Sequence, residues 1–241
     1  MSYLIFLIFG LAPSTIWLLF FLREDVHPEP KKQVLKIFLW GALISLPAIF
    51  IERGIFELTN ELNLPKILYI FLGIATVEEM LKYLVVKEKV ITNPEFDEPL
   101  DAPLYMIISA LGFAALENLL FFFSPEIFLL SFGEIFVLAS FRFITATFLH
   151  ALCSGLVGYF LAQSIFKSKK RFKLISAGLV TAVILHGSYN FSLIILESPS
   201  KFLIPIIILA SLALLISLGF KNLKKMKSVC MPANQLEHQN N

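Results

Sequence analysis

Charged side chains are scarce in this 241-residue sequence: 16% of its residues are Asp, Glu, Lys or Arg, whereas 57% are hydrophobic. Soluble globular domains carry about 25% charged residues, so this composition excludes a water-soluble domain as well as a disordered chain. The formal net charge of +2 is too small for a polyanion-binding surface, which excludes a nucleic-acid partner. The sequence therefore predicts a membrane protein whose principal surroundings are the lipid bilayer.

Cysteine is equally scarce, with Cys153 inside an apolar run and Cys230 in the polar C-terminal stretch. Two such cysteines exclude a disulfide framework and a cysteine-based metal cluster. The first apolar stretch has no basic segment before it and is too long for the core of a signal peptide, so we interpret it as a retained helix.

Long hydrophobic runs dominate the rest of the chain. A helix needs about 20 residues to cross the hydrocarbon core, and seven runs approach or exceed that length, at about 2–22, 34–51, 66–86, 103–123, 135–166, 173–196 and 202–220. The second run is short, and the fifth is long enough to tilt, to extend into the cytoplasm or to begin with a re-entrant turn near Phe132 and Gly133. Helical lengths without ten-residue alternating segments favour helices over a barrel. We predict an all-α, polytopic transmembrane bundle of about seven helices.

The few loop charges indicate how the bundle is oriented. Counted over alternate loops, Lys and Arg total fourteen on one side and three on the other. By the positive-inside rule, the N-terminus lies outside and the C-terminus is cytoplasmic. We find no internal repeat, and we expect one domain over residues 1–223 followed by a disordered polar cytoplasmic tail over 224–241.

Ionisable and amide side chains also occur within four of the apolar runs, where lipid opposes them by several kcal/mol each. The first, second and seventh runs are nearly free of such groups. The four consecutive runs between them carry Glu78, Glu79 and Lys82, then Glu117 and Asn118, then Arg142 and His150, and finally His186 and Asn190. This asymmetry predicts one polar site inside the bundle.

Spacing supports contacts between these groups. Glu78 and Glu79 precede Lys82 by four and three positions, so their carboxylates can reach its ammonium on one helix face. His186 and Asn190 are likewise one helical turn apart. Small residues nearby would let the helix backbones approach closely, namely Gly112, Ala114, Ala115, Gly155 and Gly158.

A purely structural interpretation competes with a functional one. A single intramembrane His or Asn often only bonds to a neighbouring helix, and a Glu–Lys pair can serve packing specificity alone. Helix packing does not require three glutamates and two histidines together, so the set favours a functional site. Glu79 has the weakest case, because it points about 100° away from Glu78 on an ideal helix.

Taken in order, the motifs Glu78-Glu79-x-x-Lys82, Gly112-Phe113-Ala114-x-x-Glu117-Asn118, Arg142 with His150, and His186-x-x-x-Asn190 resemble the PrsW family of membrane-embedded proteases. That family is related to the CAAX-prenyl endopeptidases and the bacterial CPBP (Abi) proteins. The resemblance covers about residues 70–192 and includes the Glu98-Pro99-x-Asp101 approach to the fourth run.

The resemblance implies an intramembrane endopeptidase with its motif-bearing core at about 66–196, in a prokaryotic cell membrane. Its substrate would be a membrane protein or peptide of the anti-sigma-factor type. The CAAX-type pattern differs in having Arg one position beyond Lys82 and His in place of Glu117, so the roles of its residues do not transfer directly.

Amide hydrolysis requires a base for water, donors for the developing oxyanion and an acid for the leaving amine. In the hypothesis that we favour, no cofactor is required, and Glu78 is the base while the two histidines and Asn190 supply donors and protons. In the alternative, zinc is bound by His150, His186 and Glu117, and Glu78 remains the base. The predicted site residues are Glu78, Glu79, Lys82, Glu117, Asn118, Arg142, His150, His186 and Asn190.

Two other classes of protein compete with a protease. A transporter of ions or small molecules could use buried carboxylates and histidines as a relay, but it would normally show duplicated halves or matching broken helices, which this sequence lacks. A catalytically inactive, peptide-binding membrane scaffold would tolerate replacement of Glu78.

Overall fold

The computed structural model describes residues 3–25, 27–91, 93 and 96–226, and within these residues the regular structure is entirely helical. The elements are α1 (Tyr3–Leu22), α2 (Lys31–Glu61), α3 (Lys66–Leu68), η1 (Tyr69–Ala75), α4 (Thr76–Lys89), α5 (Asp101–Phe122), η2 (Ile127–Leu129), α6 (Phe132–Ile144), α7 (Ala146–Phe166), η3 (Ser168–Lys170), α8 (Arg171–Ile195) and α9 (Ser200–Leu223). Six helices in this part of the chain are long and apolar enough to cross a membrane, with α6 and α7 forming one of them. The predicted all-α transmembrane fold class is confirmed.

The third predicted run is a composite helix, in which α3, η1 and α4 follow one another without a gap from Lys66 to Lys89. Its middle part, η1, is a π-helix. At its end the carbonyl oxygen of Phe71 accepts hydrogen bonds from both the backbone N–H and, at 2.7 Å, the hydroxyl of Thr76. Such insertions occur often at functional sites because they change where the following side chains point. Here the residues that follow are Glu78 and Glu79.

One expectation about helix boundaries is wrong, and one of the three alternatives for the fifth run does not occur. The second helix is long rather than short, because α2 continues past the predicted end at residue 51 to Glu61. The fifth run has no re-entrant turn at Phe132, where α6 begins as an ordinary helix with Ser131 and Glu134 forming a capping box. Its irregularity lies at Thr145, whose φ of −110° and ψ of −78° separate α6 from α7.

Helix α5 lies at the centre of the bundle and packs against α1, α2 and α7. At Gly112 its backbone approaches α2 so closely that a Cβ would lie 1.9 Å from the carbonyl oxygen of Phe38. At Gly158, α7 approaches α5 similarly, since a Cβ there would lie 2.3 Å from the Cα of Pro103. The close approach predicted for these two glycines is confirmed, and it brings the motif-bearing helices together.

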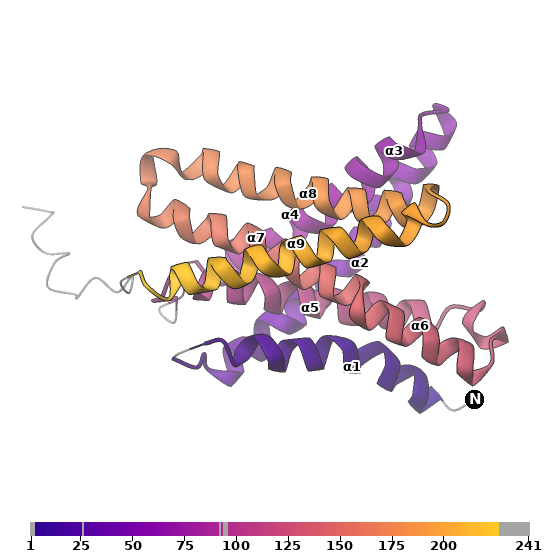
Figure 1. The fold of residues 1–241 in the computed structure, drawn as a ribbon, viewed down its shortest axis with the longest axis horizontal. Coiled ribbons are helices and arrows are strands. Elements are labelled where there is room, and N and C mark those ends of the chain that lie inside the picture. Colours follow the sequence, from indigo (N-terminus) through magenta and orange to yellow (C-terminus); the bar gives the residue numbers. More distant parts are fainter. Residues whose placement is uncertain (1–2, 26, 92, 94–95, 227–241) are drawn as a thin grey trace, which may run out of the picture.

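Figure 1 shows the start of α1 and the end of α9 at opposite ends of the bundle, and α3 at the tip of the end that lies away from the end of α9. Most of the predicted tail, residues 227–241, lies outside the described residues.

Candidate functional site

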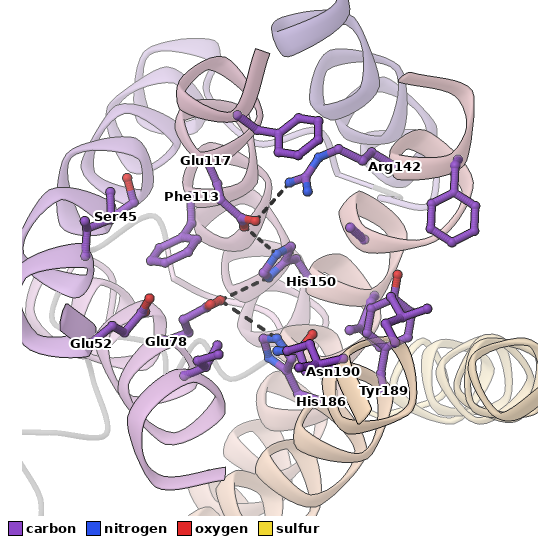
Figure 2. A pocket seen from close by; sticks show the side chains of 18 of the residues that line it. Ser45, Glu52, Glu78, Phe113, Glu117, Arg142, His150, His186, Tyr189 and Asn190 are labelled. Carbon is purple, nitrogen blue, oxygen red and sulfur yellow. Dashed lines mark hydrogen bonds and ion pairs between the residues drawn. The ribbon is translucent and has the colours of Figure 1, made fainter. Parts of the chain in front are cut away.

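A cavity of about 440 Å³ opens within the bundle, and its walls come from α2, η1, α4, α5, α6, α7 and α8. Figure 2 shows the side chains that line it. Six of the nine predicted site residues are among them: Glu78, Glu117, Arg142, His150, His186 and Asn190. The other three, Glu79, Lys82 and Asn118, are fully buried and contact the lining residues.

Lys82 is the buried cation at the centre of this group. Its Nζ donates to Glu78 Oε2 at 3.0 Å and to Glu79 Oε1 at 2.9 Å, and it lies 2.8 Å from His150 Nδ1. The ring of Phe113 covers it at 4.5 Å from the ring centre. Because an ammonium has donors only, His150 Nδ1 must accept, which places the proton of a neutral His150 on Nε2.

His186 is oriented by the second glutamate of the pair. Its Nδ1 lies 2.9 Å from Glu79 Oε1, and since a carboxylate only accepts, Nδ1 carries the proton. Its Nε2 therefore presents a lone pair, 4.0 Å from Glu78 Oε2. His150 Nδ1 lies 3.5 Å from the same oxygen. The acceptor nitrogens of both imidazoles thus converge on Glu78.

Arg142 organises the opposite side of the cavity. Its Nη2 donates to Glu117 Oε1 at 2.9 Å, and its Nε donates to Asn118 Oδ1 at 2.6 Å. Asn118 in turn donates to the hydroxyl of Thr147 at 3.0 Å. This chain of contacts connects α5, α6 and α7, and it holds the carboxylate of Glu117 at the cavity wall.

One oxygen of Glu117 lacks a well-formed hydrogen bond. Oε2 lies 2.9 Å from His150 Nε2, which is hydrogen-bonding distance, but the geometry is unfavourable and the atom is buried without a satisfied partner. Buried polar atoms are normally hydrogen-bonded, so an exception in a cavity often marks a position where a ligand or water bonds. Glu117 Oε2 can accept a hydrogen bond from a molecule in the cavity.

Glu78, His150 and His186 together offer a donor set for a metal ion, because one ligand atom from each lies within 4.8 Å of the others and all three residues are buried. Ligand atoms around a tetrahedral zinc ion are about 3.3 Å apart. The separations of 3.5 Å and 4.0 Å from Glu78 Oε2 are close to that value. The remaining nitrogen of each imidazole faces a carboxylate, as is usual for histidine ligands.

These residues fit a zinc-type ion, but the set differs from the predicted zinc ligands in one residue, and Lys82 competes for one of its atoms. The structure groups Glu78 with the histidines, whereas Glu117 lies at the other ring nitrogen of His150. In addition, Lys82 contacts both Glu78 Oε2 and His150 Nδ1, so a bound ion would have to replace the latter contact.

Two cavity residues were missed in the sequence. Tyr189 has a buried hydroxyl without a well-formed hydrogen bond, and it lies three positions after His186 on α8, a helical spacing that could have identified it. Glu52 lies one position beyond the predicted end of the second run, so hydropathy assigned it to a loop. No pattern in the sequence indicates that its side chain faces inward.

Comparison with known proteins identifies the family. Residues 29–218 match the model of the PrsW family of intramembrane metalloproteases. Among curated proteins, the chain is 34% identical to the protease PrsW of Geobacillus kaustophilus, over 78% of this chain and 79% of that protein. It is 30% identical to the protease PrsW of Bacillus subtilis, over 92% of this chain and 95% of that protein. No solved structure matches the chain. With the predicted motifs gathered around one cavity, this chain is a multi-pass integral membrane protein that belongs to the PrsW family of intramembrane proteases.

Proposed function

We propose that the chain hydrolyses a peptide bond of a membrane-associated, single-pass protein of the anti-sigma-factor type in the cavity around Glu78. The convergence of two imidazole acceptor nitrogens on the Glu78 carboxylate carries the proposal. A site of this kind can bind and activate a water molecule inside the bundle. Neither the packing of the helices nor the membrane topology requires two imidazoles to face this carboxylate.

The family description and the Glu78–His150–His186 group support a metal-dependent form of this site. When bound, a zinc-type ion would lower the pKa of water and polarise the substrate carbonyl. In that form Glu79 would orient His186, and Glu117 Oε2, which faces His150 Nε2 without a well-formed hydrogen bond, would be the acceptor for a proton of the attacking water.

A second form requires no cofactor and is favoured by the contact between Lys82 and His150. Here Glu78 itself takes the proton of the attacking water, and Lys82 stabilises the carboxylate before the reaction. Both forms depend on Glu78, and they differ in their response to a chelator.

The donors for the developing oxyanion come from α8 in either form. The amide of Asn190 and the hydroxyl of Tyr189 both line the cavity, and neither makes a well-formed hydrogen bond within the described part of the chain. Donors that are already held near the reacting carbonyl lower the barrier because they need little reorganisation.

The predicted orientation would place the cavity toward the outer half of the bilayer. Glu117 follows Asp101 by 16 positions on α5, which is about 24 Å of helix rise from the end assigned to the cytoplasm. A substrate bond in the outer part of the membrane, or just outside it, would be within reach. Such a position suits site-1 cleavage of an anti-sigma factor, the cut made before any other in stress signalling. We further propose that residues 1–223 form one protease domain.

The test is a proteoliposome assay with a panel of single-pass peptides, in which mass spectrometry locates the cut. We expect one internal cut in the outer half of the apolar segment or directly beside it. Binding without cleavage would indicate an inactive scaffold, and ion or solute flux without cleavage would indicate a transporter; either outcome contradicts the proposal.

A further inference from the structure

Glu52 lines the cavity from the side of α2. Ser45, Ile49 and Glu52 follow one another at helical spacing and together form the α2 wall. Figure 2 shows the carboxylate of Glu52 directed into the cavity on the same side as Glu78. An acidic side chain therefore borders the space in which we propose that the substrate binds.

Glu52 differs from the other carboxylates of the site in having no partner. Glu78 and Glu79 share Lys82, and Glu117 is paired with Arg142. Within the described part of the chain, Glu52 makes no hydrogen bond and no ion pair, although it is partly buried on a membrane-spanning helix. The charged form of an unpaired carboxyl group is costly in such surroundings, so a cation that enters the cavity would stabilise it.

The charges around the cavity indicate what that partner is. Its lining contains three carboxylates, those of Glu52, Glu78 and Glu117, against the single guanidinium of Arg142. Behind the lining, the charges of Glu79 and Lys82 offset each other. Glu52, Glu78 and Glu117 line the same cavity, so their charged forms repel one another, whereas Lys82 lies behind the lining and is paired with Glu78 and Glu79. A cation placed here would relieve the repulsion and would meet no positive side chain on the α2 wall.

We propose that Glu52 is a specificity-determining residue that binds the side chain of a Lys or Arg of the substrate, within about three positions of the cleaved bond. This inference rests on the proposed proteolytic function and adds the class of substrate: single-pass proteins with a basic residue next to the cleaved bond. Basic residues are less common at the outer end of a span than at the cytoplasmic end, so this requirement would restrict the range of substrates, and the long side chain of Lys or Arg can reach the polar region from such a position.

A direct role for Glu52 in the metal group is not supported by the geometry. The group of ligand atoms within 4.8 Å consists of Glu78, His150 and His186 and does not include Glu52. Its carboxylate also makes no contact that would orient either histidine. The position of Glu52 suits a substrate side chain rather than the reacting bond.

The experiment measures kcat/KM for matched peptides that carry Lys, Met or Glu at each of three positions on either side of the cut. The full-length chain in proteoliposomes is compared with Glu52→Gln and Glu52→Lys. For the wild-type protein we expect Lys to be preferred over Met by about 10-fold at one position, which corresponds to about 1.4 kcal/mol. The preference should fall to about 1 in Glu52→Gln, and Glu52→Lys should prefer the Glu peptide.

Glu57→Gln is the matched control, because Glu57 lies on the same helix, is exposed and pairs with Arg53 outside the cavity. It should keep the preference for Lys. A wild-type protein that cleaves Lys and Met peptides equally at all six positions would overturn the proposal. An equal loss on all peptides in a folded Glu52→Gln variant would overturn it as well, because Glu52 would then act in the reaction itself.

A binding measurement separates this proposal from the proposed function. The affinity of the same peptides is measured with Glu78→Gln in detergent, with and without the added Glu52→Gln change. A preference for Lys that depends on Glu52 supports the inference even if no peptide is cleaved. If Lys and Met peptides bind with equal affinity, the inference fails whatever the result of the cleavage assay.

Discussion

Lys82 Nζ lies 2.8 Å from His150 Nδ1, although the two residues are separated by 68 positions and lie on α4 and α7. The contact fixes the ring nitrogen that faces Glu78, and it joins the Glu-Glu-x-x-Lys motif to a histidine from a different part of the sequence. A buried ammonium with two carboxylates and an imidazole around it is expected to be strongly coupled to the stability of the site.

Replacing Lys82 by Met should destabilise the protein by about 3–5 kcal/mol, because it leaves the buried carboxylates of Glu78 and Glu79 without their cation. Thermal unfolding of purified protein in detergent measures the effect. The double variant Lys82→Met, Glu79→Gln also removes one of the two carboxylates left without a cation, so it should recover part of the lost stability. Additive losses in the double variant would contradict this account of the ion pair.

Changing Arg142 to Gln should lower kcat by about 100-fold, since the guanidinium positions Glu117 and holds Asn118. The cleavage rate in proteoliposomes measures it. Arg53→Gln serves as the control, because Arg53 is an exposed arginine that pairs with Glu57 outside the cavity. Equal activities of the two variants would exclude a positioning role for Arg142.

Treatment with a zinc chelator should abolish cleavage, and added zinc should restore it, because Glu78, His150 and His186 have the types and spacing of zinc ligands. The metal content of purified wild-type protein and of His186→Ala, measured by mass spectrometry, provides a second readout. Zinc should be present in the first and largely lost in the second. Full activity of metal-free protein would instead establish the form in which no cofactor is required.

Stability should fall between about pH 4.5 and pH 8 because of Glu29, in the loop between α1 and α2. Burial and the nearby charges of Asp101 and Asp25 raise the pKa of Glu29 from 4.5 to about 8, even though Tyr105 donates to its carboxylate at 2.5 Å. The folded protein therefore binds one more proton than the unfolded chain in this window, so its stability decreases as pH rises through it. Glu29→Gln should reduce this dependence, as measured by unfolding midpoints at pH 5 and pH 8. An unchanged pH dependence in the variant would contradict the assignment.

Much of the fold could be predicted because lipid restricts the choice. Apolar runs of sufficient length must become helices, and the close helix contacts at Gly112 and Gly158 follow from the lack of a side chain. Hydropathy cannot locate the end of a helix whose last turns carry polar residues, however. It therefore ended the second helix at residue 51 and missed that α2 continues to Glu61.

The site could be predicted as a set of residues but not as a set of contacts. Ionisable and amide side chains at bilayer depth gave nine candidates, and the structure gathers them around one cavity. Which carboxylate faces which ring nitrogen depends on helix rotation and tilt, which spacing does not give. Glu52 and Tyr189 illustrate the limit, because their direction follows only from how α2 and α8 pack against the others.

The most direct test of the account is the cleavage activity of Glu78→Gln in proteoliposomes, since the acceptor nitrogens of both histidines converge on that carboxylate. The amide keeps the size of the side chain and one acceptor oxygen for Lys82, so we expect the variant to insert and fold. Its unfolding midpoint should be within a few degrees of the wild-type value, while its cleavage rate should be at least about 1000-fold lower. A folded Glu78→Gln variant that retains cleavage within about 10-fold of the wild-type rate would contradict the central claim.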